Sequence, residues 1–195
     1  MSEVFYPDRL DCMPDKRIFL SRAGARYGRI DESLIHRVNE LFLVALEKIE
    51  PVVFYSTLSL SLLPEQMIPS NFQNVTAITV FLSTLGSSID NLISRLTEQQ
   101  RTFDAFIVDS WASESLEKLN ERFDHLLRER FGKGTMRFSP GYGNVDLRMN
   151  GYIVRELLKV DQVKVLDSGV MIPRKTTTCM IGWFDEKRRV PENVE

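Results

Sequence analysis

The chain has 195 residues, of which 43% are hydrophobic and 27% are charged, and its formal net charge at pH 7 is -2. These values are typical of a globular protein of one domain or a tight pair, and the slight negative charge gives no electrostatic argument for nucleic-acid binding. No run of 18 apolar residues predicts a membrane helix, and the N-terminus lacks the basic and apolar regions of a signal peptide. We therefore expect a cytoplasmic protein.

The cysteine and histidine content argues against a metal site and against nucleophilic catalysis. Cys12 and Cys179 are the two cysteines, and they predict small buried side chains rather than a disulfide framework. His36 lies beside an apolar stripe with no second ligand at metal spacing, which favours a structural or surface role. No Ser-His-Asp or Cys-His set is evident, so we expect a binding module rather than a self-contained enzyme.

The first half of the chain predicts an N-terminal arm, a helix and two strands. Residues 1–20 read as an irregular arm that packs late or partly frays, and the glycine-bearing residues 22–29 read as a turn-rich entry. Asp31 can cap a helix that Pro51 ends, since the apolar residues between them recur at helical spacing. Residues 52–60 predict a strand, and the nearly continuous apolar residues 75–83 predict a central strand covered on both faces.

Residues 84–88, Thr-Leu-Gly-Ser-Ser, lie between that strand and a helix that we expect to reach Gln99. A glycine-bearing loop before a helix N-terminus can present free N–H groups to an anion. A plain turn capped by Ser87 or Ser88 explains the same residues equally well.

Residues 102–131 predict one long helix that ends at Gly132. Asp109 and Glu114 are of interest because a carboxylate here would stabilise a bound sulfonium or ammonium group. The alternative for Glu114 and Glu117 is a solvated helix face. The residues expected on the inner face are Phe103, Phe106, Ile107, Ser110, Leu116, Leu119, Phe123, Leu126 and Leu127.

The C-terminal part predicts a shorter helix and several strands. Asp146 can cap a helix over residues 147–159, a short connector or strand is expected at 163–166, and a short strand is expected at 170–172. Residues 176–184 predict a last strand that returns as a hairpin, and residues 185–195 predict a charged tail. We expect one α+β domain over residues 1–184, with a mainly antiparallel, twisted sheet and long packed helices.

Residues 136–147 stand apart from the regular pattern. Pro140-Gly141 is typical of the centre of a type II turn, and a second glycine follows Tyr142. Arg137 carries a planar, permanent cation that suits a carboxylate. Together these residues could hold a small molecule with a carboxylate and a flat ring, but taken by themselves they favour a surface turn with a solvated arginine.

Residues 137–142, Arg-Phe-Ser-Pro-Gly-Tyr, resemble the Arg-x-x-Pro-Gly-Tyr signature of the activation domain of cobalamin-dependent methionine synthase. The resemblance spans about residues 22–182, and the chain looks like a free-standing version of that module. Three weaker matches follow the family in the same order: Thr84-Leu85-Gly86, Ala112-Ser113-Glu114, and residues 168–176, which match a Ser-x-x-Met-x-Pro-x-Lys-Ser run.

The resemblance implies an S-adenosylmethionine site. Arg137 would pair with the methionine carboxylate, and the Ser139 backbone with the Pro140-Gly141 turn would contact the adenosine. Tyr142 would line the pocket and face the partner. Val170 matches a position that contacts the ligand through its backbone, and the family's ligand-binding acid falls at Ser113, beside Glu114.

The resemblance also implies a function in methionine biosynthesis. The family supports the methyltransferase by reductive methylation of inactive cob(II)alamin, which needs S-adenosylmethionine and an electron from flavodoxin or a similar donor. The cobalamin would be held by the partner synthase. Two alternatives are a docking or reactivation module for another corrinoid protein, and a free-standing methyltransferase for a small molecule.

Overall fold

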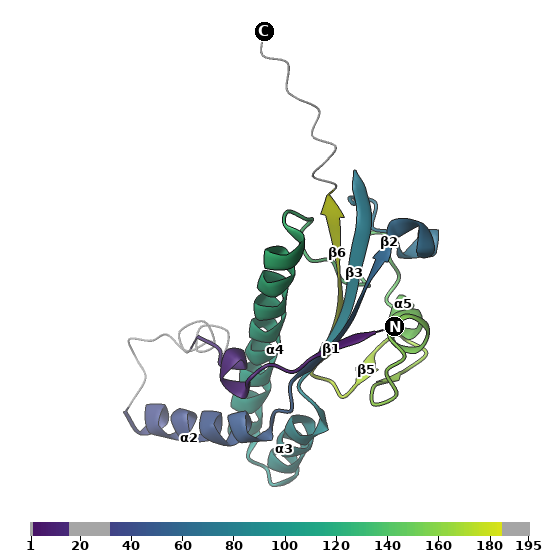
Figure 1. The fold of residues 1–195 in the computed structure, drawn as a ribbon. Coiled ribbons are helices and arrows are strands. Elements are labelled where there is room, and N and C mark those ends of the chain that lie inside the picture. The colour runs from purple at the N-terminus through teal and green to yellow at the C-terminus, as the bar shows by residue number, and fades with distance from the viewer. Residues whose placement is uncertain (1, 16–31, 185–195) are drawn as a thin grey trace.

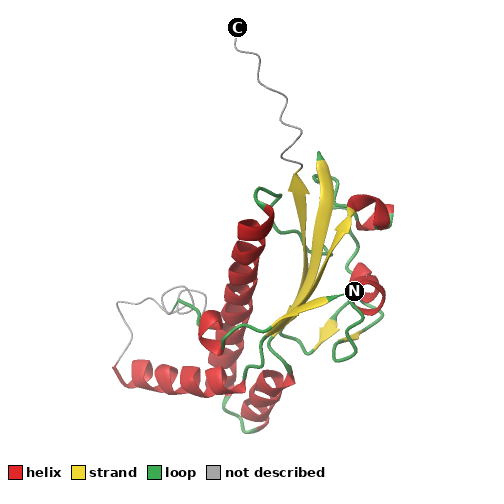
Figure 2. Cartoon of the chain, in the orientation of Figure 1, coloured by secondary structure: helices red, strands yellow, loops and turns green. Residues whose placement is uncertain are grey.

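The computed structural model describes residues 2–15 and 32–184 (Figures 1 and 2). The predictions for residues 16–31 and for the tail at 185–195 lie outside these ranges. A twisted four-stranded antiparallel sheet has the order β1-β2-β3-β6, and a separate hairpin pairs β4 with β5. The strands are β1 (Glu3–Phe5), β2 (Val52–Ser59), β3 (Val75–Thr84), β4 (Lys164–Val165), β5 (Met171–Ile172) and β6 (Thr176–Phe184).

Helices cover both faces of the main sheet (Figures 1 and 2). The first face packs against three long helices and the 3₁₀ turn at Arg9–Cys12, and the second face packs against the other short helical segments and the hairpin. The helices are α2 (Glu32–Lys48), α3 (Ser87–Glu98), α4 (Thr102–Phe131) and α5 (Met149–Tyr152). The 3₁₀ turns are η1 (Arg9–Cys12), η3 (Leu60–Leu62) and η4 (Glu65–Met67), and α5 continues into the π-helical segment η5 (Ile153–Leu157).

Strand β3 is the centre of the sheet, as its continuous apolar sequence predicts. It pairs with β2 from Val52↔Thr84 to Ser59↔Ala77 and with β6 along its other edge. Its side chains alternate between two cores: Phe81 enters the core beneath α2, α3 and α4, while its neighbours Val80 and Leu82 enter the core on the opposite face. Burial on both sides explains why polar alternation is missing from this strand.

The first core is built around aromatic side chains that tie the sheet to α4. Trp111 is fully buried, and the ring of Phe123 lies 5.0–5.5 Å, centroid to centroid, from the rings of Phe5, Tyr55 and Phe81. Phe5 belongs to the arm expected to be irregular and partly frayed, and that expectation is wrong for Glu3–Phe5 and Arg9–Cys12. The segment instead forms β1, which pairs with β2, and buries Cys12 completely.

Helix α4 has the predicted bounds, but part of its predicted inner face is wrong. Phe103 and Phe106 are 46% and 50% exposed, whereas Asp104 and Trp111 are fully buried. Asp104 is accommodated because Arg37 and Arg101 each place a guanidinium nitrogen 2.7 Å from its carboxylate oxygens. Apolar periodicity alone does not reveal that Arg37 of α2 pairs with Asp104 and allows this charged residue to be buried.

Two other local predictions are also wrong. Helix α3 is capped by Gly86, at φ +80°, rather than by Ser87 or Ser88. Asp146 does not cap the next helix, which begins at Met149; its carboxylate accepts hydrogen bonds from the side chain and backbone of Arg148, which lower the pKa of Asp146 to about 2.

The expected C-terminal hairpin involves different strands. Strand β6 does not return on β5; it pairs with β3 over its whole length, while β5 pairs with β4. The last strand of the sheet therefore pairs with a strand that is distant in the sequence, whereas neighbouring strands in a sheet are more often consecutive in the chain.

We expect Asp104→Asn to lower the free energy of unfolding by about 2 kcal/mol at pH 7, the usual loss for hydrogen bonds to a charged group. Hydrogen bonds from Arg37, reinforced by Arg101 and opposed by burial, lower the pKa of Asp104 below its ordinary value of 3.8. The ionised carboxylate therefore contributes its full stabilisation at pH values above 3.8. This stabilisation is lost as the pH falls through the lower pKa of the folded state. Urea unfolding from pH 7 downward should show wild type and variant converging in acid. The exposed Asp161→Asn is the control, and equal stability of Asp104→Asn and wild type at pH 7 would contradict the assignment.

Candidate functional site

Residues 139–142 form the predicted type II turn. Gly141, at its third position, has φ +94°, and the N–H of Tyr142 donates to the carbonyl of Ser139 at 3.4 Å. The N–H of Gly141 donates to the carbonyl of Val145 at 2.8 Å, which closes the loop that follows. These bonds leave the turn projecting from the fold, with the Tyr142 ring 70% exposed.

The segment before the turn is held against the free edge of β6. Phe138 and Met180 exchange both backbone hydrogen bonds, at 2.9 and 2.7 Å, and Gly134 bridges to Trp183 further along. Phe138 packs into the second core, with its ring centroid 6.1 Å from that of Phe72. Successive side chains of an extended segment point to opposite faces, so Arg137 points to the other face, where α4 lies.

Charged and polar residues line the side of α4 that meets this edge. Asp109, Ser113 and Glu117 are spaced by four residues and therefore share one helix face. Arg137 donates to the Glu117 carboxylate at 3.3 Å, and the ammonium nitrogen of Lys175 lies 2.9 Å from both the Asp109 carboxylate and the Ser113 hydroxyl. We call these five residues the ion-pair row.

The two ion pairs of the row differ in exposure. The Lys175 side chain is only 11% exposed and anchors the first residues of β6 to α4, while its partner Asp109 is 44% exposed. The Arg137 side chain is 23% exposed and Glu117 is 48% exposed, so this second pair is accessible from solvent. The two carboxylates are eight residues apart on the helix, which corresponds to roughly 12 Å.

Cys179 lies beneath the turn, next to Ser139. Its sulfur lies 3.4 Å from the Ser139 hydroxyl, and burial raises the pKa of the thiol above its ordinary value, against the opposing effects of Ser139 and Arg137. The sulfur is therefore a neutral, buried packing group, as the sequence predicted for Cys179, and a thiolate nucleophile is disfavoured here.

Val170 is connected to the turn through Leu147, which packs on both Gly169 and Gly141. It lies in the loop of the β4–β5 hairpin and is 48% exposed. The preceding Gly169 packs so closely on the backbone of Leu147 that a β-carbon there would come 2.6 Å from the Leu147 carbonyl carbon, and the Leu147 side chain packs on Gly141. Tyr142, Leu147 and Val170 are all exposed, and we call these three residues the turn surface.

Among the sequence-predicted acids, the structure brings Glu117 rather than Glu114 to Arg137. Glu114 is 4% exposed on a neighbouring face of α4, where its charge helps to raise the pKa of Lys118 after the larger effect of Glu121. The solvated alternative therefore fits Glu117 but not Glu114. In the sequence, the signal for the ion-pair row is the four-residue spacing of Asp109, Ser113 and Glu117, which places them on one face of α4.

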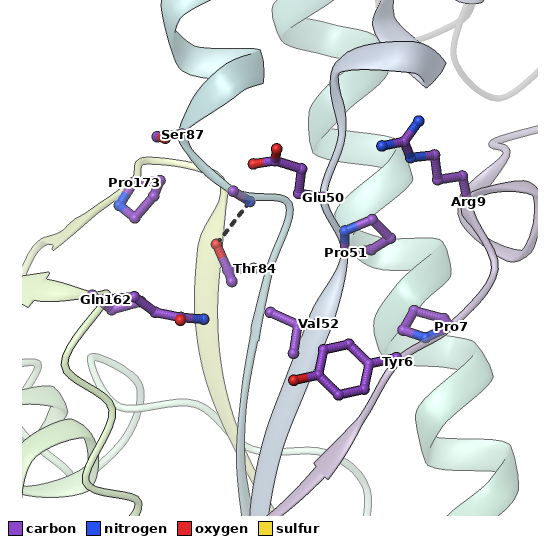
Figure 3. A pocket seen from close by; sticks show the side chains of 12 residues that line it. Tyr6, Pro7, Arg9, Glu50, Pro51, Val52, Thr84, Ser87, Gln162 and Pro173 are labelled. Atoms are coloured by element: carbon purple, nitrogen blue, oxygen red, sulfur yellow. Dashed lines mark hydrogen bonds between the residues drawn. The ribbon is translucent and has the colours of Figure 1, made fainter.

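The described residues contain no cluster of three or more histidine, cysteine, aspartate or glutamate side chains suited to a metal ion. Within the same ranges, no helix combines the length and apolarity needed to cross a membrane. A cavity of about 520 Å³ lies away from the turn, beside the start of α3 (Figure 3).

No family model and no curated protein matches this chain in sequence. A solved structure does match in fold: a crystal structure of the MetH reactivation domain bound to AdoHcy. The match has a TM-score of 0.65 and 15% sequence identity, and it covers 95% of this chain and 79% of that one. The chain therefore has the α+β fold of that domain, with an antiparallel sheet and packed helices, as the sequence predicted.

We expect Gly141→Ala to lower the free energy of unfolding by about 1–2 kcal/mol, because a β-carbon is disfavoured at positive φ. The added carbon would also lie 3.2 Å from a methyl group of Leu147. Asn tolerates such backbone better, so Gly141→Asn should lose less stability. Chemical unfolding of the three proteins gives the order; equal stability of all three would contradict the observed turn.

Proposed function

We propose that the chain binds S-adenosylmethionine at the ion-pair row, beside the type II turn. The observation that carries the proposal is the accessible Arg137–Glu117 pair, with its nitrogen–oxygen distance of 3.3 Å. The methionine part of the ligand is a zwitterion, which can replace one direct pair by two: its carboxylate on Arg137 and its ammonium on Glu117. An arginine fork suits a carboxylate in particular, since it donates two parallel hydrogen bonds.

The turn supplies the contacts for the adenosine. Gly141 is exposed and has no side chain, so a flat ring can approach its backbone from the side away from Leu147. Ser139 would contribute through its backbone, because its hydroxyl faces Cys179. Tyr142 is exposed enough to cover the bound ligand, and Val170 would reach it from the adjoining hairpin loop.

The ion pair between Lys175 and Asp109 gives the row its rigidity. Lys175 is held by two bonds of 2.9 Å to different residues of α4, which fixes β6 relative to the helix. A site built on a helix and a strand edge holds its groups in place before the ligand arrives, and this lowers the cost of binding.

We propose further that the bound ligand donates its methyl group to cobalamin held by a partner protein, as in the reactivation of methionine synthase. Cobalamin, when present, would supply the methyl-accepting chemistry, and a flavodoxin-like donor would supply one electron. The described residues would act by orientation, since holding a methyl donor in line with its acceptor is worth several kcal/mol. We assign the turn surface of Tyr142, Leu147 and Val170 to that partner, because its apolar side chains are exposed.

Isothermal titration with S-adenosylmethionine tests the binding proposal. Arg137→Ala and Glu117→Gln should each weaken binding at least tenfold, because each removes a charged hydrogen bond worth about 1.5–3 kcal/mol. The exposed Arg122→Ala on the same helix is the matched control and should bind as wild type does. Unchanged affinity in Arg137→Ala, with the fold intact by circular dichroism, would remove the assigned role of the pair.

Reactivation is tested separately with a cobalamin-dependent methionine synthase that lacks its own activation module. The chain, S-adenosylmethionine and a reductant should restore turnover of the cob(II) form, and Arg137→Ala should not. Ligand binding without restored turnover would favour the alternative, a module for another corrinoid protein.

A further inference from the structure

The cavity of about 520 Å³ lies where β3 ends and α3 begins, and no residue of the ion-pair row is part of its lining (Figure 3). Five segments meet there: the chain after β1, the α2–β2 and β3–α3 connections, the segment before β4, and the β5–β6 connection. Its volume lies within the range of small-molecule sites, about 300–1,000 Å³.

The cavity has one cation and one anion in its lining, Arg9 and Glu50. Neither forms an ion pair with another residue of the described ranges, and they do not pair with each other. In Figure 3 the two side chains lie at the same end of the view, with Pro51 between them. The Glu50 carboxylate accepts one long hydrogen bond, 3.4 Å from the Ser88 hydroxyl, and has further acceptor capacity.

The remaining lining is suited to an apolar body. The ring of Tyr6, which is 76% exposed, and the side chains of Pro51, Val52 and Pro173 form much of the wall. Gln162 reaches in from the side opposite Tyr6 with an amide that can donate and accept (Figure 3). An apolar wall with a few polar groups is the usual composition of a small-molecule site.

Charge restricts which ligands fit this lining. An anion would be repelled by Glu50, whose carboxylate already lies beside Gly86 at the N-terminus of α3, and a cation would be repelled by Arg9. A molecule with both charges satisfies both side chains. We propose that this cavity binds a small zwitterion, an amino acid with an apolar side chain.

The proposal is independent of S-adenosylmethionine binding at the ion-pair row, since no residue is shared between the two sites. It gives a role to the glycine-bearing loop at residues 84–88, of which Thr84, Gly86 and Ser87 line the cavity. A second, amino-acid site in this position would allow the level of a free amino acid to influence the protein.

Amide NMR spectra of the full chain, titrated with L-phenylalanine, L-leucine and L-methionine at millimolar concentration, test the proposal. At least one should bind and shift the amide signals of Gly86 and Ser87 and the side-chain amide of Gln162. For L-phenylalanine, phenethylamine and hydrocinnamate each lack one charge, and each should bind at least tenfold more weakly than the amino acid.

Two charge-removing variants complete the test. Arg9→Gln and Glu50→Gln should each weaken amino-acid binding at least tenfold and leave S-adenosylmethionine affinity unchanged, while the exposed Arg122→Gln should affect neither. Binding of none of the three amino acids, shifts confined to residues 137–142, or equal affinity of the variants and wild type would overturn the proposal.

Discussion

The structure depends on the packing of α4 along the full length of the sheet. The helix has 30 residues and runs in the same direction as β6, so that Asp109 meets Lys175 at one end while Phe131 meets Trp183 at the other. Its buried side, with Trp111 and Phe123, forms the first core. Because the same helix also carries Asp109, Ser113 and Glu117, any change in its rotation would alter both the core and the ion-pair row.

The long elements follow from local sequence, whereas their neighbours depend on distant partners. Central strand β3 and the bounds of α4 could be predicted because their patterns are long and uninterrupted. The burial of Asp104 depends on Arg37, which is 67 residues away, and the pairing of β6 with β3 joins residues about a hundred positions apart. Local patterns contain no information about such partners.

The candidate site shows the same division. The turn at residues 139–142 was predictable because proline followed by glycine restricts the backbone by itself. The partner of Arg137 was not predictable. Glu114 and Glu117 are three residues apart on α4, and only the packing of this helix decides which of them faces β6. Lys175 follows Arg174 in a charged stretch of sequence that gives no sign of burial, yet its side chain is buried between a carboxylate and a hydroxyl. A buried lysine requires partners that its own neighbours in the sequence do not supply.

The central claim is that the accessible Arg137–Glu117 pair holds the amino-acid end of an adenosyl ligand. The most direct measurement is a map of amide NMR shifts during titration with S-adenosylhomocysteine, which has the same amino-acid and adenosine parts but no sulfonium charge. The account predicts the largest shifts at residues 137–142 and on α4 around Ser113 and Glu117. Shifts centred on Gly86 and Ser87, or no shifts in a folded protein, would contradict it.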